Sequence, residues 1–130
     1  MIRKIFLFLF LSVLAAGVAQ AADHELEFAE LTYDFGTVKS DNGPVTHEYV
    51  FTNKAETPVT IMSASASCGC TRPKYSNEPV KPGKTGKIRV SFLPKGQKGY
   101  ISKNVKVRYK AAGEKMRSIT IKITGNVVPE

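Results

Sequence analysis

The chain has 130 residues, of which 19 are Lys or Arg and 11 are Asp or Glu, so its formal charge is +8. This length fits one domain, and its two cysteines are too few for a four-cysteine zinc site. Nucleic-acid binding is not expected, because no Lys/Arg run exceeds two residues and no basic–aromatic stacking pattern occurs.

Residues 1–21 contain the three parts of a secretory signal peptide. Arg3 and Lys4 supply the positive start, residues 5–14 form an apolar run, and residues 19–21 (AQA) form a small-x-small cleavage site. The apolar run is shorter than the roughly 20 residues that span a bilayer. We therefore expect export to the bacterial periplasm or medium, with a mature domain of residues 22–130.

The first segment of the mature chain, residues 26–38, changes the parity of its apolar side chains. Leu26 and Phe28 share one parity, whereas Leu31 and Tyr33 follow the other. A strand cannot shift its alternation without an extra residue or a break. The pattern predicts a first strand that kinks and crosses between two sheets.

The rest of the chain alternates apolar and polar side chains between turns rich in Gly, Pro and Asn. Further strands are expected at residues 45–53, 59–65, 87–92, 100–110 and 115–128. The side chains expected to point inward are Tyr49, Phe51, Val59, Ile61, Ile88, Val90, Phe92, Ile101, Val105, Val107, Tyr109, Ile119, Ile121 and Ile123. About seven short strands without a helix predict an all-β fold, an antiparallel immunoglobulin-like β-sandwich.

The two cysteines, Cys68 and Cys70, are separated only by Gly69. A disulfide between them needs the backbone to turn at Gly69, and it closes a ring too small to remove much unfolded-chain entropy. Such a disulfide is better suited to a labile redox role than to a structural one. Alternatively, the two reduced thiols can coordinate a soft ion such as Cu(I).

Few other residues are candidates for completing a metal or catalytic site. His24 lies near the start of the mature chain, His47 is expected as a strand-end residue, and Met62 is expected to pack in the sandwich. No acid, base and nucleophile are paired in the sequence. We therefore expect a protein that is not an enzyme.

Five motifs in order resemble a family of short secreted bacterial proteins known as a domain of unknown function. They are YDFGTV, THEYVFTN, SCGCTRP, VKPGKTGKIRVSF and ITGNV. The resemblance covers residues 26–128. SCGCT at residues 67–71 is its most specific part, residues 35–36 and 82–83 support it, and Tyr49 replaces an expected phenylalanine. It implies an exported immunoglobulin-like sandwich, similar to the hydin-type and sperm-protein modules of cilia and centrosomes, and no assigned reaction.

The leading hypothesis is a binding or assembly module that docks an envelope protein through a sheet edge, the cysteine loop or a basic face. The candidate partner-binding residues are Thr71, Arg72, Lys106, Arg108 and Lys110. The alternative hypothesis is a thiol redox or Cu(I)-binding protein that uses Cys68 and Cys70. A third hypothesis is electrostatic contact between the basic surface and anionic membranes.

Overall fold

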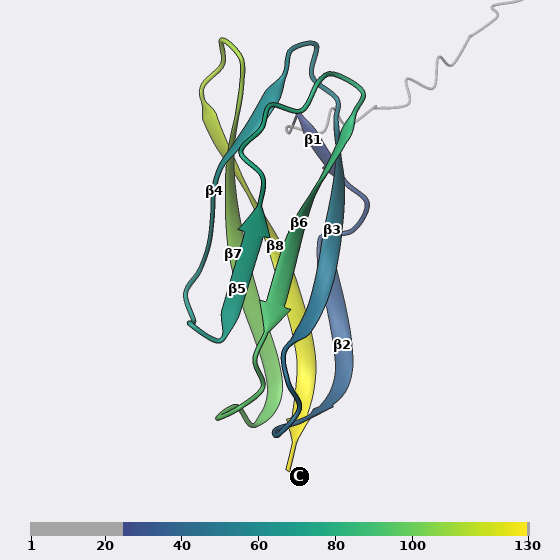
Figure 1. Ribbon diagram of the computed structural model, residues 1–130, viewed down its shortest axis with the longest axis vertical. Coiled ribbons are helices and arrows are strands. Elements are labelled where there is room, and N and C mark those ends of the chain that lie inside the picture. Colours follow the sequence, from purple (N-terminus) through teal and green to yellow (C-terminus); the bar gives the residue numbers. More distant parts are fainter. Residues whose placement is uncertain (1–24, 130) are drawn as a thin grey trace, which may run out of the picture.

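The computed structural model describes residues 25–129, which form two four-stranded β-sheets (Figure 1). Sheet A has the order β1-β3-β6-β5 and sheet B the order β2-β8-β7-β4. The strands are β1 (Leu26–Phe28), β2 (Thr32–Lys39), β3 (Val45–Asn53), β4 (Val59–Ala66), β5 (Thr71–Tyr75), β6 (Thr85–Phe92), β7 (Gly99–Ala111) and β8 (Met116–Val128). The expected all-β sandwich is confirmed, with eight strands rather than about seven.

The predicted signal peptide and His24 lie outside the described residues. Within residues 25–129, no helix of sufficient length and apolarity to cross a membrane occurs.

The predicted crossing between sheets is confirmed at the start of the domain. β1 pairs antiparallel with β3 in sheet A, whereas β2 pairs parallel with β8 in sheet B. Leu31 lies in the crossing and is 46% exposed. The β2 register shifts again between Asp34 and Thr37, where Gly36 has a φ of +71°, and Val38 is the next buried side chain.

The inner faces of the two sheets enclose one apolar core. Of the side chains expected to point inward, all are buried except Ile119, which is partly buried and packs against the core. Each fully buried side chain of this kind stabilises the fold by about 1.5 to 3 kcal/mol. The Tyr49 hydroxyl donates a hydrogen bond of 2.5 Å to the Lys122 carbonyl and so links the two sheets. Burial raises the pKa of Tyr49 and keeps this donor protonated.

β5 is the strand that the sequence did not predict, because Arg72, Pro73 and Lys74 break the alternating pattern. Proline is tolerated there because β5 is an edge strand of sheet A. The Thr71 N–H bonds the Cys68 carbonyl and so points away from β6. Pro73 is two residues after Thr71, so its backbone nitrogen, which carries no hydrogen, also faces away from β6. This edge therefore offers a poor template for an added strand.

Asn53, at the end of β3, organises the loops at one end of the sandwich. Its side-chain amide donates to the carbonyls of Thr57 and Val80 at 2.9 and 2.8 Å, and its oxygen accepts from the Ala55 N–H at 2.8 Å. The Asn53 side chain thus caps the turn that follows β3. Its backbone carbonyl accepts from the Gly83 N–H, and Gly83 has a φ of +76°.

We predict that Asn53→Ala lowers the free energy of unfolding by about 3 kcal/mol, because it leaves buried backbone groups without partners. Urea denaturation of the mature domain measures this change. Asn77→Ala is the matched control, since Asn77 is exposed in the β5–β6 connection. Equal midpoints for the two variants would show that Asn53 has no organising role.

Candidate functional site

The cysteine turn, residues 67–70, carries the chain from β4 in sheet B to β5 in sheet A (Figure 1). The Thr71 N–H donates to the Cys68 carbonyl at 3.1 Å, which closes a β-turn with Gly69 and Cys70 at its centre. The predicted turn at Gly69 is therefore present. It does not use the left-handed region of glycine, because neither central residue has a positive φ.

Cys68 and Cys70 are joined by a disulfide, with their Cα atoms 5.2 Å apart. The two sulfurs have different surroundings. The Cys70 side chain packs against the core, with its sulfur 3.6 Å from the Thr71 hydroxyl, whereas the Cys68 sulfur lies 3.2 Å from the Cys70 N–H. A backbone donor favours the charged form of a thiol, and apolar packing disfavours it. The two sulfurs are therefore not equivalent, and the Cys68 sulfur is the one beside a backbone N–H.

The five residues predicted to bind a partner do not form one surface. Thr71 is only 3% exposed, so its side chain lies in the interior. Arg72 lies on the outer face of sheet A, paired in register with Ser91 of β6. The other three residues alternate with buried side chains of β7 and therefore lie on the outer face of sheet B.

We call Lys106, Arg108 and Lys110 the basic stripe. β7 lies between β4 and β8, so each cation has neighbours on both sides. Lys106 is in register with Ser65 and Thr120, and Arg108 is in register with Ser63 and Ser118. Within the part of the chain that the structure describes, no acidic side chain forms an ion pair with the stripe. The result is a row of uncompensated cations flanked by hydroxyl groups.

A hollow of about 420 Å³ connects the basic stripe to the cysteine turn. Its lining includes Lys106, Asn104, Thr120, Ser65 and Ser67, and Ser67 directly precedes Cys68. The hydroxyl residues of this lining, Ser65, Ser67 and Thr120, were not among the predicted site residues. The signal was present in residues 63–67, SASAS, where alternate serines extend along one face of a strand.

The remaining candidate ligands lie away from the cysteine turn. The His47 ring stacks on Tyr33 with centroids 3.6 Å apart and pairs with Glu30, and β6 separates its strand from β5. Met62 is 47% exposed at an irregularity in β4, so the expectation that it packs inside is wrong. Among residues 25–129, no group of three or more His, Cys, Asp or Glu could hold a metal ion.

Comparison with solved structures supports the same fold. The ASH/PapD-like domain 7 of human CEP192 is 13% identical, with a TM-score of 0.68 over 82% of this chain and 87% of that one. WR4, an MSP family member of C. elegans, is 11% identical, with a TM-score of 0.55 over 80% and 98%. The periplasmic chaperone SfaE is 11% identical, with a TM-score of 0.59 over 78% of this chain and 56% of the chaperone. These identities show a shared fold only.

At the level of sequence, no curated protein matches the chain. A family model described as "Protein of unknown function (DUF1573)" matches residues 26–127, nearly all of the described domain. Together with the likeness to an MSP family member and a PapD-like domain, this match confirms the family and the fold that the resemblance implied. The chain belongs to the DUF1573 family.

Proposed function

We propose that this protein is an exported binding module that docks an acidic protein partner of the bacterial envelope on the basic stripe of sheet B. The observation that carries the proposal is the register of β4, β7 and β8, which sets the cations between rows of hydroxyl groups, with no ion pair to them among the described residues. Carboxylates accept hydrogen bonds from both kinds of group, and those from charged donors are the stronger.

The rigidity of the stripe supports this proposal. Its side chains project from a central strand whose inward residues Val105, Val107 and Tyr109 are each 0% exposed. The cations are therefore held at fixed spacing on a surface that needs no rearrangement to bind. Individual exposed ion pairs contribute only about 0.2 to 1 kcal/mol, so the stripe provides orientation and association rate more than tight affinity.

We predict that the double variant Lys106→Glu, Lys110→Glu loses the envelope proteins that the wild-type domain recovers from cross-linked cells. The matched control is Lys95→Glu with Lys98→Glu, which makes the same charge change in the exposed β6–β7 loop. Recovery is quantified by mass spectrometry at low and high salt.

Three outcomes separate the hypotheses. Loss in the stripe variant alone supports docking at sheet B, and equal recovery by both variants contradicts it. Binding to anionic lipid vesicles that contain no protein, lost equally in both variants, would favour electrostatic membrane attachment instead.

A second candidate function is thiol–disulfide exchange, which the unequal surroundings of Cys68 and Cys70 favour. In the reduced protein, the Cys68 thiolate attacks a disulfide of a partner protein and forms a mixed disulfide. The Cys70 thiol then displaces the second partner sulfur, so the partner becomes a dithiol and Cys68–Cys70 is oxidised. The same reduced pair offers two thiolates to Cu(I), which titration against a competing Cu(I) chelator tests.

The exchange reaction predicts an asymmetry between two single variants. Cys70→Ser should accumulate a mixed disulfide through Cys68, because the resolving thiol is absent, whereas Cys68→Ser should accumulate none. Alkylation of free thiols in intact cells, followed by non-reducing electrophoresis and mass measurement, detects the adduct. Equal adducts, or none in either variant, would contradict exchange through Cys68.

A further inference from the structure

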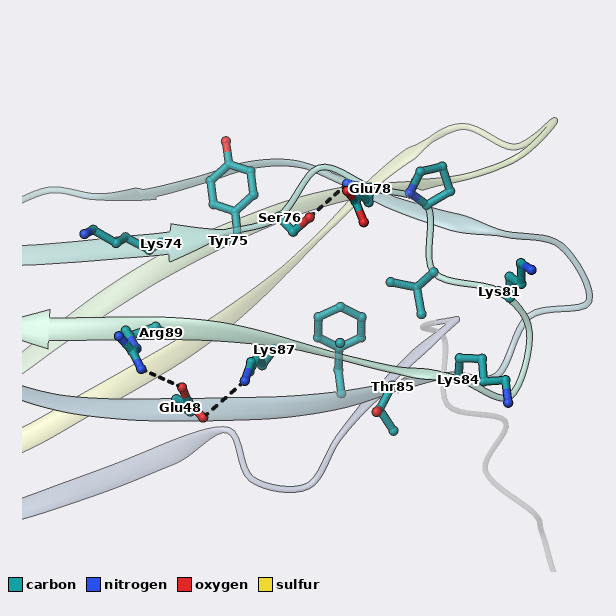
Figure 2. Close-up of a pocket in the computed structure, with 14 residues that line it drawn as sticks. Glu48, Lys74, Tyr75, Ser76, Glu78, Lys81, Lys84, Thr85, Lys87 and Arg89 are labelled. Carbon is teal, nitrogen blue, oxygen red and sulfur yellow. Dashed lines mark hydrogen bonds and ion pairs between the residues drawn. The ribbon is translucent and has the colours of Figure 1, made fainter.

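A groove of about 660 Å³ lies on the outer side of sheet A, where β5 and β6 separate (Figure 2). The pairing of the two strands ends at Tyr75 and Ile88. Beyond Tyr75 the chain leaves sheet A, and Val80 forms a two-way backbone bridge with Val59 of β4 in sheet B. The first residues of β6 are therefore left without a strand on that side.

The uncovered part of β6 presents backbone groups to the groove. The Leu93 N–H donates to the Cys70 carbonyl, so odd-numbered residues of β6 direct their backbone groups toward β5. The carbonyl of Lys84, an even-numbered residue, accepts from Asn53 on the β3 side, which agrees with this parity. Thr85 is odd-numbered and lies beyond the last β5 pair. Its N–H and C=O face the position that an added strand would occupy.

Two apolar side chains close the groove on the side of the core. Phe51 and Val80 line it from β3 and from the β5–β6 connection, and Phe51 is itself buried. The Phe51 ring packs directly against Gly86, where an added Cβ would come within 2.4 Å of the ring. The absence of a side chain at Gly86 thus allows the ring to pack against the strand.

The rim of the groove is basic. Lys74, Lys81, Lys84, Lys87 and Arg89 line it, against only two acidic side chains, Glu48 and Glu78. Glu48 is already engaged, at 2.9 Å from Arg89 and 3.9 Å from Lys87, as Figure 2 shows. Among the described residues, the other three lysines of the rim form no ion pair.

We propose that this groove binds an extended acidic segment of a partner protein, which pairs with β6 at Thr85. In an extended segment, successive side chains point to opposite faces. Acidic side chains on one face meet Lys74 and Lys84, while apolar side chains on the other face cover the partly exposed Val80. The groove lies on the sheet opposite the basic stripe, so this site is separate from the one assigned to the proposed function.

The probe is a fluorescent, end-capped hexapeptide of alternating glutamate and valine, titrated with the whole mature domain and followed by fluorescence anisotropy. We expect Lys74→Glu with Lys84→Glu to weaken binding by about tenfold or more, since two attractive contacts become repulsive. Lys106→Glu with Lys110→Glu makes the same charge change on sheet B and should leave the affinity within about twofold. A peptide of alternating glutamine and valine should bind about tenfold more weakly than the acidic one.

A second measurement does not depend on any variant. In the isotopically labelled wild-type domain, the acidic peptide should shift the backbone amide resonance of Thr85 and leave those of Lys106 and Arg108 in place. Unchanged affinity in the Lys74/Lys84 variant, equal binding of the neutral peptide, or shifts confined to sheet B would each overturn the proposal. The two lysine pairs are on opposite sheets. A negative result for the groove therefore does not contradict docking at the basic stripe, and a negative result for the stripe does not contradict binding in the groove.

Discussion

The structure depends on one constraint, the burial of a single apolar layer between two sheets. Alternation along each strand decides which side chains fill that layer, and it forces their neighbours outward. On β7, Val105, Val107 and Tyr109 are fully buried, so Lys106 and Arg108 must face solvent. The positions of the cations on the surface are therefore a direct consequence of the packing of the core.

The same constraint places basic residues on both outer faces. On β6, the buried side chains Ile88 and Val90 alternate with Lys87 and Arg89. On sheet A, Glu48 of β3 pairs with both of these cations, whereas no ion pair among residues 25–129 involves the basic stripe of sheet B. Composition gives the net positive charge only as a total. In the folded chain, this charge is divided between two outer faces whose cations have different ion-pair partners.

The candidate functional sites arise where the chain passes from one sheet to the other. The cysteine turn is the passage from β4 in sheet B to β5 in sheet A, and its first residue, Ser67, lines the same hollow as Lys106. The groove exists because the chain leaves β6 after Tyr75 and reaches Val59 in the other sheet. Connections between layers leave parts of strands uncovered, and an uncovered strand can accept a partner.

Sequence patterns predicted the sandwich and its inward side chains, because a period of two is read within a single strand. They failed where the outcome depends on distant residues. β5 was missed because Pro73 is acceptable only at a sheet edge, which local sequence does not reveal. The placement of Arg72 and Lys106 on opposite sheets also depends on strand pairing, which local sequence does not reveal. The groove could not be predicted, since Phe51, Val80 and Gly86 meet only in the folded chain.

The fold is maintained by the apolar core and not by the Cys68–Cys70 disulfide, whose ring is too small to remove much unfolded-chain entropy. Hydrogen–deuterium exchange of the oxidised and the reduced domain measures this difference. Amide protection in β3, β6, β7 and β8 should stay the same after reduction, with faster exchange confined to residues 67–72. Loss of protection throughout both sheets on reduction would contradict it.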